Sequence, residues 1–107
     1  MSSGQVKGNL DLLLLSLLAK GEAHGYELIG RLRRNSGGEF DLPEGTIYPA
    51  LHRMESEGLV TSNWVRESGR RKRIYRLTVP GREALTAKQR EWKRYRAGVE
   101  KVLGSLA

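Results

Sequence analysis

Apolar residues follow a helical pattern in the first half of the chain, an alternating pattern after it and a helical pattern again at the end. Residues 10–19 are leucine-rich on nearly every side, which predicts a central helix buried by several neighbours. We expect this helix to begin near Gly8 or Asn9, because residues 1–7 are small and polar, and to end at Lys20-Gly21. The chain is therefore predicted to form one core around this helix.

A second helix is predicted over His24–Arg34. Tyr26, Ile29 and Leu32 recur at a spacing of three and mark its apolar face. The run Asn35–Gly38 then breaks the helical pattern, so a long turn separates this helix from the next one.

A third helix, residues 44–57, is predicted to have one apolar and one polar face. Its apolar residues lie at the i, i+3, i+4, i+7 spacing and are Ile47, Ala50, Leu51 and Met54. The opposite face carries donors and a cation, from Gly45, Pro49, His52, Arg53 and Ser56, with Thr46 and Tyr48 at the boundary. Because Pro49 has no N–H to donate, this helix is expected to start close to Glu44.

Two strands are predicted next, over Leu59–Glu67 and Arg71–Val79, around a turn at Glu67–Arg70. Three helices followed by a two-stranded hairpin is the order of a winged helix-turn-helix. The predicted fold class is therefore mainly α (α+β).

A last helix is predicted from Pro80 to about Leu103. Its apolar stripe consists of Leu85, Trp92, Tyr95, Val99, Val102 and Leu106. A monomer would expose this stripe, whereas a symmetric dimer would cover it; a helix lying on a membrane surface is the competing interpretation. We divide the chain into a winged helix-turn-helix DNA-binding domain, residues 1–79, and a C-terminal dimerisation helix, residues 80–107.

Composition narrows the choice of partners. With 107 residues the chain is long enough for one compact domain, and 19 Lys and Arg against 12 Asp and Glu give a net charge of +7. This charge favours a polyanionic partner, either nucleic acid or an anionic membrane surface. The chain has no cysteine, which excludes disulfides and thiol catalysis, and its apolar runs are too short to span a bilayer, so we expect a cytoplasmic protein that does not insert into membranes.

The sequence gives little support for catalysis. His24 and His52 have no metal-ligand spacing with acidic residues. Glu55 and Glu57 are two residues apart on a helix, so they lie on different faces and cannot act as a pair. We expect no enzyme activity, no metal and no cofactor.

The chain is predicted to carry a DNA-binding surface. The consecutive cations Arg70–Arg73 must point to both faces of a strand, and Glu67 cannot pair with all of them, so either they contact phosphates or they form a solvated charged turn. On the third helix, Arg53 has the fork that matches a guanine edge. Helix 44–57 beside a basic wing, residues 66–73, predicts a reader of duplex DNA.

Three segments resemble a known family. GNLDLLLLSLLAKGEAHGYELIGRL from Gly8, GTIYPALHRMESEGLV from Gly45 and GRRKRIYRLT from Gly69 are similar to PadR-type transcriptional regulators over nearly the whole chain. The resemblance implies a homodimeric winged-helix repressor of a (pseudo)palindromic operator, with C-terminal helices that cross between subunits. It also implies that Tyr48 anchors the DNA backbone; Tyr26 either does the same or is buried. The predicted DNA-binding residues are Tyr26, Gly45, Thr46, Tyr48, Pro49, His52, Arg53, Arg70, Arg71, Lys72 and Arg73.

The last helix has two candidate roles. Its single short form resembles the smaller branch of the family, which includes the multidrug-sensing regulator of lactococci, whose like-placed aromatic residue corresponds to Trp92. This implies that Trp92 binds a small planar aromatic effector, whereas dimer packing is the simpler interpretation. The predicted dimer interface is Leu10, Leu14, Leu85, Trp92, Tyr95, Val99, Val102, Leu103 and Leu106. The alternative function is a winged-helix module that binds protein or RNA without reading DNA sequence.

Overall fold

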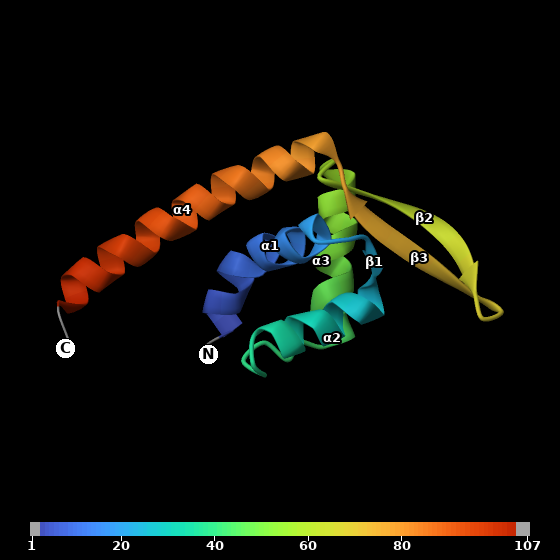
Figure 1. Cartoon of the computed structure of the whole chain (residues 1–107), viewed down its shortest axis with the longest axis horizontal. Coiled ribbons are helices and arrows are strands. Elements are labelled where there is room, and N and C mark those ends of the chain that lie inside the picture. The colour runs from blue at the N-terminus through green and yellow to red at the C-terminus, as the bar shows by residue number, and fades with distance from the viewer. Residues whose placement is uncertain (1–2, 105–107) are drawn as a thin grey trace.

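The computed structural model describes residues 3–104, and the side chains from residue 9 onward. In chain order its elements are α1 (Ser3–Ala19), β1 (Ala23–His24), α2 (Gly25–Asn35), α3 (Glu44–Ser56), β2 (Val60–Glu67), β3 (Arg70–Leu77) and α4 (Val79–Leu103). Figure 1 shows α1, α2 and α3 grouped at the centre, with the β2–β3 hairpin on one side and α4 on the other. The predicted α+β winged helix-turn-helix is confirmed.

Helix α1 is the buried centre of the molecule, as its leucine pattern predicted. It packs against α2, α3, α4 and β3, and Leu14 and Leu15 are fully buried. The prediction that the helix begins near Gly8 was wrong, because α1 begins at Ser3. Once the buried leucines fix the helix, each further residue adds a hydrogen bond at little entropic cost, so a helix extends past its apolar segment.

Helix α2 was predicted at the right place, and of its predicted apolar face Leu32 is buried and Ile29 packs against the core, but Tyr26 was wrong. Its buried residues are Gly25, Leu28 and Leu32, whereas Tyr26 is 68% exposed. The pair Leu28 and Leu32, four residues apart, sets the orientation, and this turns Tyr26 outward. His24 caps the helix: its Nδ1 accepts from the Glu27 N–H, and the Glu27 carboxylate accepts from the His24 N–H.

Helix α3 confirms the predicted division into two faces. Ile47, Ala50, Leu51 and Met54 are buried, and the helix starts at Glu44. Pro49 lies inside the helix rather than in its first turn, which deprives the Gly45 carbonyl of its helical donor. Gly45 is exposed, so water can satisfy this carbonyl.

The sheet has three antiparallel strands in the order β1-β3-β2. The β2–β3 hairpin turns over Ser68 and Gly69, whose φ angles of 51° and 77° are those of the type I′ turn that suits the twist of a hairpin. The two-residue strand β1 pairs Ala23 with Tyr75 and His24 with Ile74. It was not predicted, because two residues are too few to show an alternating pattern. Strand β1 pairs with β3 at Ile74 and Tyr75, so on that side the edge of β3 is open over residues 70–73.

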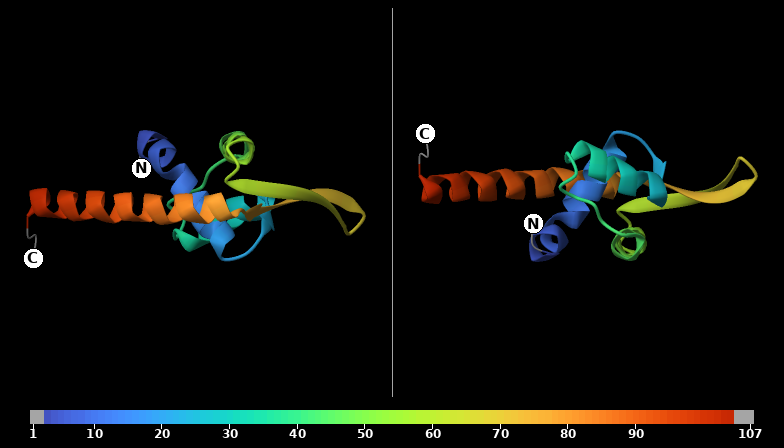
Figure 2. Two further views of the ribbon diagram at one scale, coloured as in Figure 1. Left: turned by 90° about the horizontal axis from the view of Figure 1, so that it is seen from above. Right: turned by 90° about the horizontal axis from the view of Figure 1, so that it is seen from below.

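Helix α4 begins against the core and then leaves it. Thr78 caps its first turn by accepting from the Gly81 N–H, and a Cβ at Gly81 would lie 1.9 Å from the Leu59 carbonyl oxygen, so only glycine permits this approach. From residue 89 to residue 104 every residue is exposed. Figure 2 shows α4 projecting at one end of the molecule and the hairpin at the other.

Part of the predicted dimer interface is corrected by this packing. Leu10, Leu14 and Leu85 are buried within the single chain, so their side chains contact its own core and are not available to a second copy. Leu106 lies outside the described residues. Among residues 3–104, no helix is long and apolar enough to cross a membrane.

Candidate nucleic-acid interface

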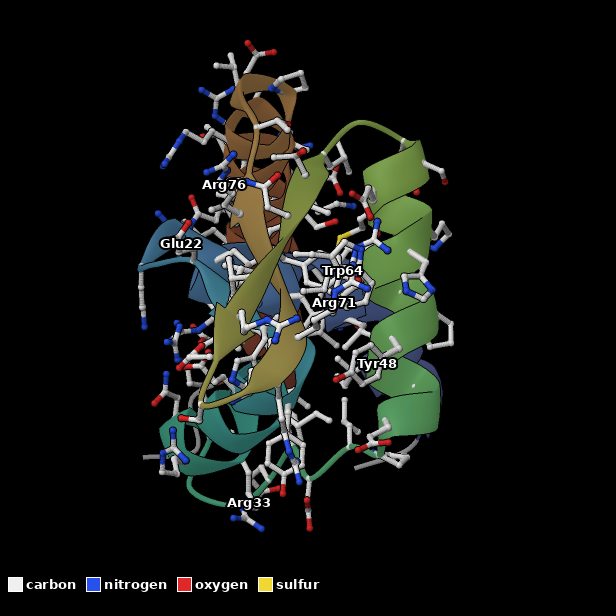
Figure 3. All side chains as sticks on the ribbon, turned by 90° about the vertical axis from the view of Figure 1, so that its right-hand side faces the viewer. Glu22, Arg33, Tyr48, Trp64, Arg71 and Arg76 are labelled. Carbon is white, nitrogen blue, oxygen red and sulfur yellow. The ribbon has the colours of Figure 1, made fainter. Side chains whose placement is uncertain are left out.

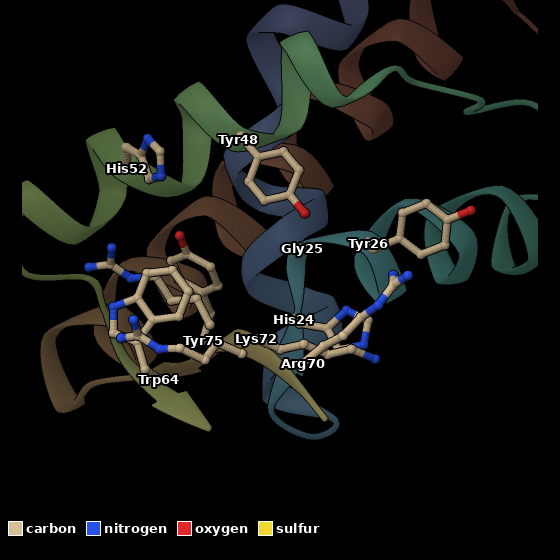
Figure 4. Close-up of a pocket in the computed structure, with 11 residues that line it drawn as sticks. His24, Gly25, Tyr26, Tyr48, His52, Trp64, Arg70, Lys72 and Tyr75 are labelled. Carbon is tan, nitrogen blue, oxygen red and sulfur yellow. The ribbon is translucent and has the colours of Figure 1, made fainter. Parts of the chain in front are cut away.

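Tyr48 lies where α3 meets the start of α2. Its ring covers the bare backbone of Gly25: a Cβ added there would be 2.5 Å from Cε1 of the ring. The Tyr48 hydroxyl also forms a hydrogen bond with the Tyr26 backbone. Figure 4 shows this hydroxyl directed toward Gly25, whereas Tyr26 is directed away from Tyr48. Tyr48 is thus held in one orientation, while Tyr26 is open to the outside.

The surroundings of Tyr48 keep its hydroxyl protonated. Burial raises the pKa of Tyr48, the negative charge of Glu44 raises it further, and the backbone hydrogen bond from Tyr26 opposes both. An unperturbed tyrosine already titrates near pH 10. The hydroxyl is therefore a hydrogen-bond donor at neutral pH, as a contact with phosphate requires.

Arg53 does not have the free guanidinium that was predicted. It donates through Nη2 to Oδ1 of Asp11 and through Nη1 to Oδ2 of Asp11 at 3.0 Å and to Oε1 of Glu57 at 2.7 Å. Hydrogen bonding to Asp11, above all, raises the pKa of Arg53. A guanine contact would require these bonds to break, so in this structure Arg53 joins α3 to α1. The remaining predicted residues of α3 lie at its surface: Gly45, Pro49 and His52 are exposed and Thr46 is half-buried.

The wing splits its four cations between two faces of the hairpin. Arg73 lies opposite Trp64 and Arg71 opposite Arg66, so both share the face of Trp64, while Arg70 and Lys72 alternate to the other face. The Arg71 guanidinium lies 4.8 Å from the centre of the Trp64 ring. Figure 3 shows Trp64 and Arg71 on the side of the hairpin toward α3, and Arg76 near Glu22 on the other side.

Arg73 is bound within the protein, unlike its three neighbours. It donates through Nε to Oγ of Ser62 at 2.6 Å and through Nη2 to Oε1 of Glu55 at 3.2 Å. Within residues 9–104, no ion pair holds Arg70, Arg71 or Lys72. The prediction that the wing has more cations than it can pair internally is therefore confirmed, with Arg73 as the internally paired member.

All four cations nevertheless line one hollow. The hollow lies between the start of α2, the exposed side of α3 and the hairpin (Figure 4). Residues from both faces of β3 line it. Its lining residues, called the hollow below, are His24, Gly25, Tyr26, Tyr48, His52, Trp64, Arg70, Arg71, Lys72, Arg73 and Tyr75. None of them is acidic, so the hollow is electrostatically suited to an anion.

Two contributors to this surface were missed from the sequence. Trp64 was interpreted only as a β-favouring residue, although its place opposite Arg73 puts an aromatic face among cations. Gly25 was not singled out, although a glycine in the first turn of a helix can signal that another group approaches the backbone closely.

Helices α1, α2 and α3, followed by a basic β2–β3 hairpin, define a winged helix-turn-helix protein. The chain belongs to the PadR-like family of transcriptional regulators, whose family model matches residues 14–87. It is 40% identical to Transcriptional regulator Rv3488 of Mycobacterium tuberculosis over 79 residues, which are 74% of this chain and 71% of that protein.

Two further relatives agree with this assignment. The crystal structure of a PadR family transcription regulator from Clostridium difficile R20291 has a TM-score of 0.80 and 38% identity, covering 90% of this chain and 99% of the other. The Negative transcriptional regulator PadR of Bacillus subtilis is 30% identical over 71% of this chain and 42% of its own length. The family consists of transcriptional regulators and not enzymes, so the prediction of no enzyme activity is confirmed. In the described part of the chain, no group of three metal-ligating side chains could hold an ion.

We predict that Gly25→Ala displaces the Tyr48 ring and lowers the free energy of unfolding by about 1–2 kcal/mol, because the new Cβ overlaps the ring. In a Tyr48→Ala background the overlap is gone, and the same substitution should stabilise the protein by about 0.4–1 kcal/mol, since alanine restricts the unfolded chain. Urea unfolding of the four proteins at one protein concentration measures this coupling. An equal cost of Gly25→Ala in both backgrounds would show that the ring does not depend on Gly25.

Proposed function

We propose that the protein is a homodimeric transcriptional repressor that acts in the cytoplasm and binds a (pseudo)palindromic operator through α3 and the wing. The observation that carries this proposal is the acid-free surface on which Tyr48 of α3 meets the unpaired Arg70, Arg71 and Lys72. The exposed face of α3 fits a major groove, and the wing cations fit the flanking phosphates.

The two parts of this surface have different tasks. The wing cations supply attraction that does not depend on DNA sequence, since phosphates are the same at every site. Gly45, Pro49 and His52 lie on the exposed side of α3, where base edges would be read. Tyr48, whose ring lies on Gly25, contributes a hydroxyl for the DNA backbone. Arg53 instead joins α3 to α1 through its hydrogen bonds to Asp11. Tyr26, exposed at the start of α2, is a second candidate for a backbone contact.

Dimer formation is proposed from the exposed apolar stripe of α4. Trp92 is 41% exposed and Val102 88% exposed, and the same stripe includes Tyr95, Val99 and Leu103. An apolar stripe of this length favours a partner helix, and a second copy offers a self-complementary one. A twofold dimer also separates its recognition helices by about one DNA turn, roughly 34 Å.

Repression, and its relief by a small ligand, are proposed from two different observations. The Bacillus subtilis relative is named a negative regulator, which favours repression as the direction of control here. Trp92 lies with its ring centre 6.2 Å from that of Tyr95, so a dimer would hold exposed aromatic faces near its axis. We include a small planar aromatic effector at Trp92 in the proposal on this basis.

The wing is tested by replacing Arg70, Arg71 and Lys72 with glutamine. We expect weaker binding to all duplexes by similar factors and a salt slope of log affinity that falls by roughly 2–3 per protomer, because each lost phosphate contact removes about 0.9. Fluorescence anisotropy with a promoter duplex and an unrelated duplex, at several salt concentrations, measures both quantities.

The matched control removes three charges elsewhere. Arg90, Arg94 and Lys101 are exposed on the face of α4 opposite Trp92, so their glutamine variant should retain the native salt slope. Equal slopes for the two triple variants would mean that only net charge matters. A weak salt response of the unmodified protein would instead favour a module that binds protein.

The dimer is tested by Val99→Glu, which places a charge in the proposed interface. We expect the dimer dissociation constant to rise by at least about 100-fold, because a buried carboxylate without a partner is costly. Ala97→Glu adds the same side chain to another face of α4 and should leave the dimer unchanged. Sedimentation velocity over a concentration series measures both; equal dissociation by the two variants would contradict the proposed interface.

A further inference from the structure

The hollow is larger than a phosphate contact requires. Its volume is about 730 Å³, within the range of roughly 300–1,000 Å³ that is usual for pockets of small organic ligands. A single phosphate group of a DNA backbone fills a small part of such a space. The hollow therefore has room for a whole small molecule.

The lining combines two kinds of surface. Aromatic rings from three elements form its walls: Tyr48 from α3, Trp64 from β2 and Tyr75 from β3. Trp64 is 55% exposed even with Arg71 and Arg73 close to its ring, so part of the indole is open to a ligand. The Tyr48 hydroxyl supplies a donor, and burial raises its pKa, whereas Tyr75 is 1% exposed and contributes to the lining from within the core.

The cations of β3 lie at the edge of the hollow, beside these aromatic rings. Arg70 and Lys72 reach it from one face of the strand and Arg71 from the other. Two of the neighbouring acids are occupied: Glu55 is bound by Arg73, and Glu27 by His24 and Arg31. Glu44 acts only at the Tyr48 end, where its charge raises the pKa of the tyrosine. Charged residues on an open strand edge also discourage pairing with other strands, but that purpose does not require aromatic walls beside them.

We propose that the hollow is a binding site for a mononucleotide-sized aromatic phosphate, with the heteroaromatic ring among Tyr48, Trp64 and Tyr75 and the phosphate at Arg70, Arg71 and Lys72. Stacking on aromatic side chains and charge-assisted hydrogen bonds to phosphate are the two interactions that bind nucleotides without reading the base. Because the same cations belong to the proposed DNA interface, such a ligand and the operator exclude each other. This exclusion, unlike the binding itself, rests on the proposed function.

The test uses the full chain without DNA. Isothermal titration calorimetry at fixed ionic strength compares AMP with ribose 5-phosphate, which lacks the ring, and with adenosine, which lacks the phosphate. We expect one AMP per protomer, bound at least about tenfold more tightly than either fragment, since each half of the ligand has its own contacts. If ribose 5-phosphate binds as tightly as AMP, the hollow attracts any anion and the proposal is overturned.

Variants locate the site. Lys72→Gln should weaken AMP binding by about tenfold. Arg66→Gln removes the same charge from the same hairpin outside the lining of the hollow and should leave AMP binding within a factor of about two, because exposed charges outside the site contribute little. Trp64→Leu should weaken AMP binding at least about fivefold while leaving ribose 5-phosphate binding unchanged. Equal effects of Lys72→Gln and Arg66→Gln would place AMP elsewhere and overturn the proposal.

A competition experiment then tests the exclusion. With AMP at ten times its dissociation constant, the apparent affinity of the dimer for the promoter duplex should fall about 100-fold, because both hollows must be empty and each contributes a factor of about ten, whereas adenosine at the same concentration should have no effect. Bound AMP that leaves the duplex affinity unchanged would overturn the exclusion. A protein that binds AMP but no duplex would refute the proposed DNA-binding function and not the nucleotide site, so the two failures are distinguishable.

Discussion

The burial of α1 is the constraint on which the other elements depend. Leu14 and Leu15 are fully buried, and α2, α3, β3 and α4 all contact this helix, so none of them can move far without opening the core. Close packing makes such a core costly to deform. The same helix carries Asp11, whose carboxylate accepts from Arg53 and links α3 to α1 at the surface, while Ile47, Leu51 and Met54 pack α3 into the core. The polar face of α3 is thus set from the apolar centre of the fold.

A second contact places the candidate interface on this frame. Tyr48 lies on Gly25 and joins α3 to α2, while β1 joins the start of α2 to β3. Helix α3, the start of α2 and the hairpin are therefore connected by short contacts around the hollow. Because β1 has only two residues, the edge of β3 beyond Ile74 stays open and its cations reach the same space from both faces. The short strand is in this sense part of the candidate site.

Features with a local cause could be predicted from the sequence. The buried face of α3 was correct at Ile47, Ala50, Leu51 and Met54, because helical periodicity alone decides it. The hairpin turn at Ser68 and Gly69 was found because runs of β-favouring residues flank a short polar stretch that contains glycine. The excess of wing cations also follows from consecutive residues and needs no knowledge of the fold.

Features with a distant cause could not be predicted. Arg53 was assigned to DNA because its partner Asp11 is 42 residues away in the sequence. Tyr26 fitted an apolar spacing of three, but contacts of Leu28 and Leu32 with the core decided the orientation of α2. Leu10, Leu14 and Leu85 were assigned to a dimer interface because the sequence does not show which apolar residues are buried in the chain's own core. In each case tertiary packing, not local preference, determines the outcome.

The central claim, that α3 and the wing bind duplex DNA, is tested most directly by a nuclear magnetic resonance titration of the isotope-labelled protein with a duplex from its own promoter region. The account predicts that the largest amide shift changes fall at Tyr48, His52 and residues 70–72, with little change along the exposed apolar stripe of α4. Shift changes confined to α4, with those of α3 and the wing unaffected, would contradict it.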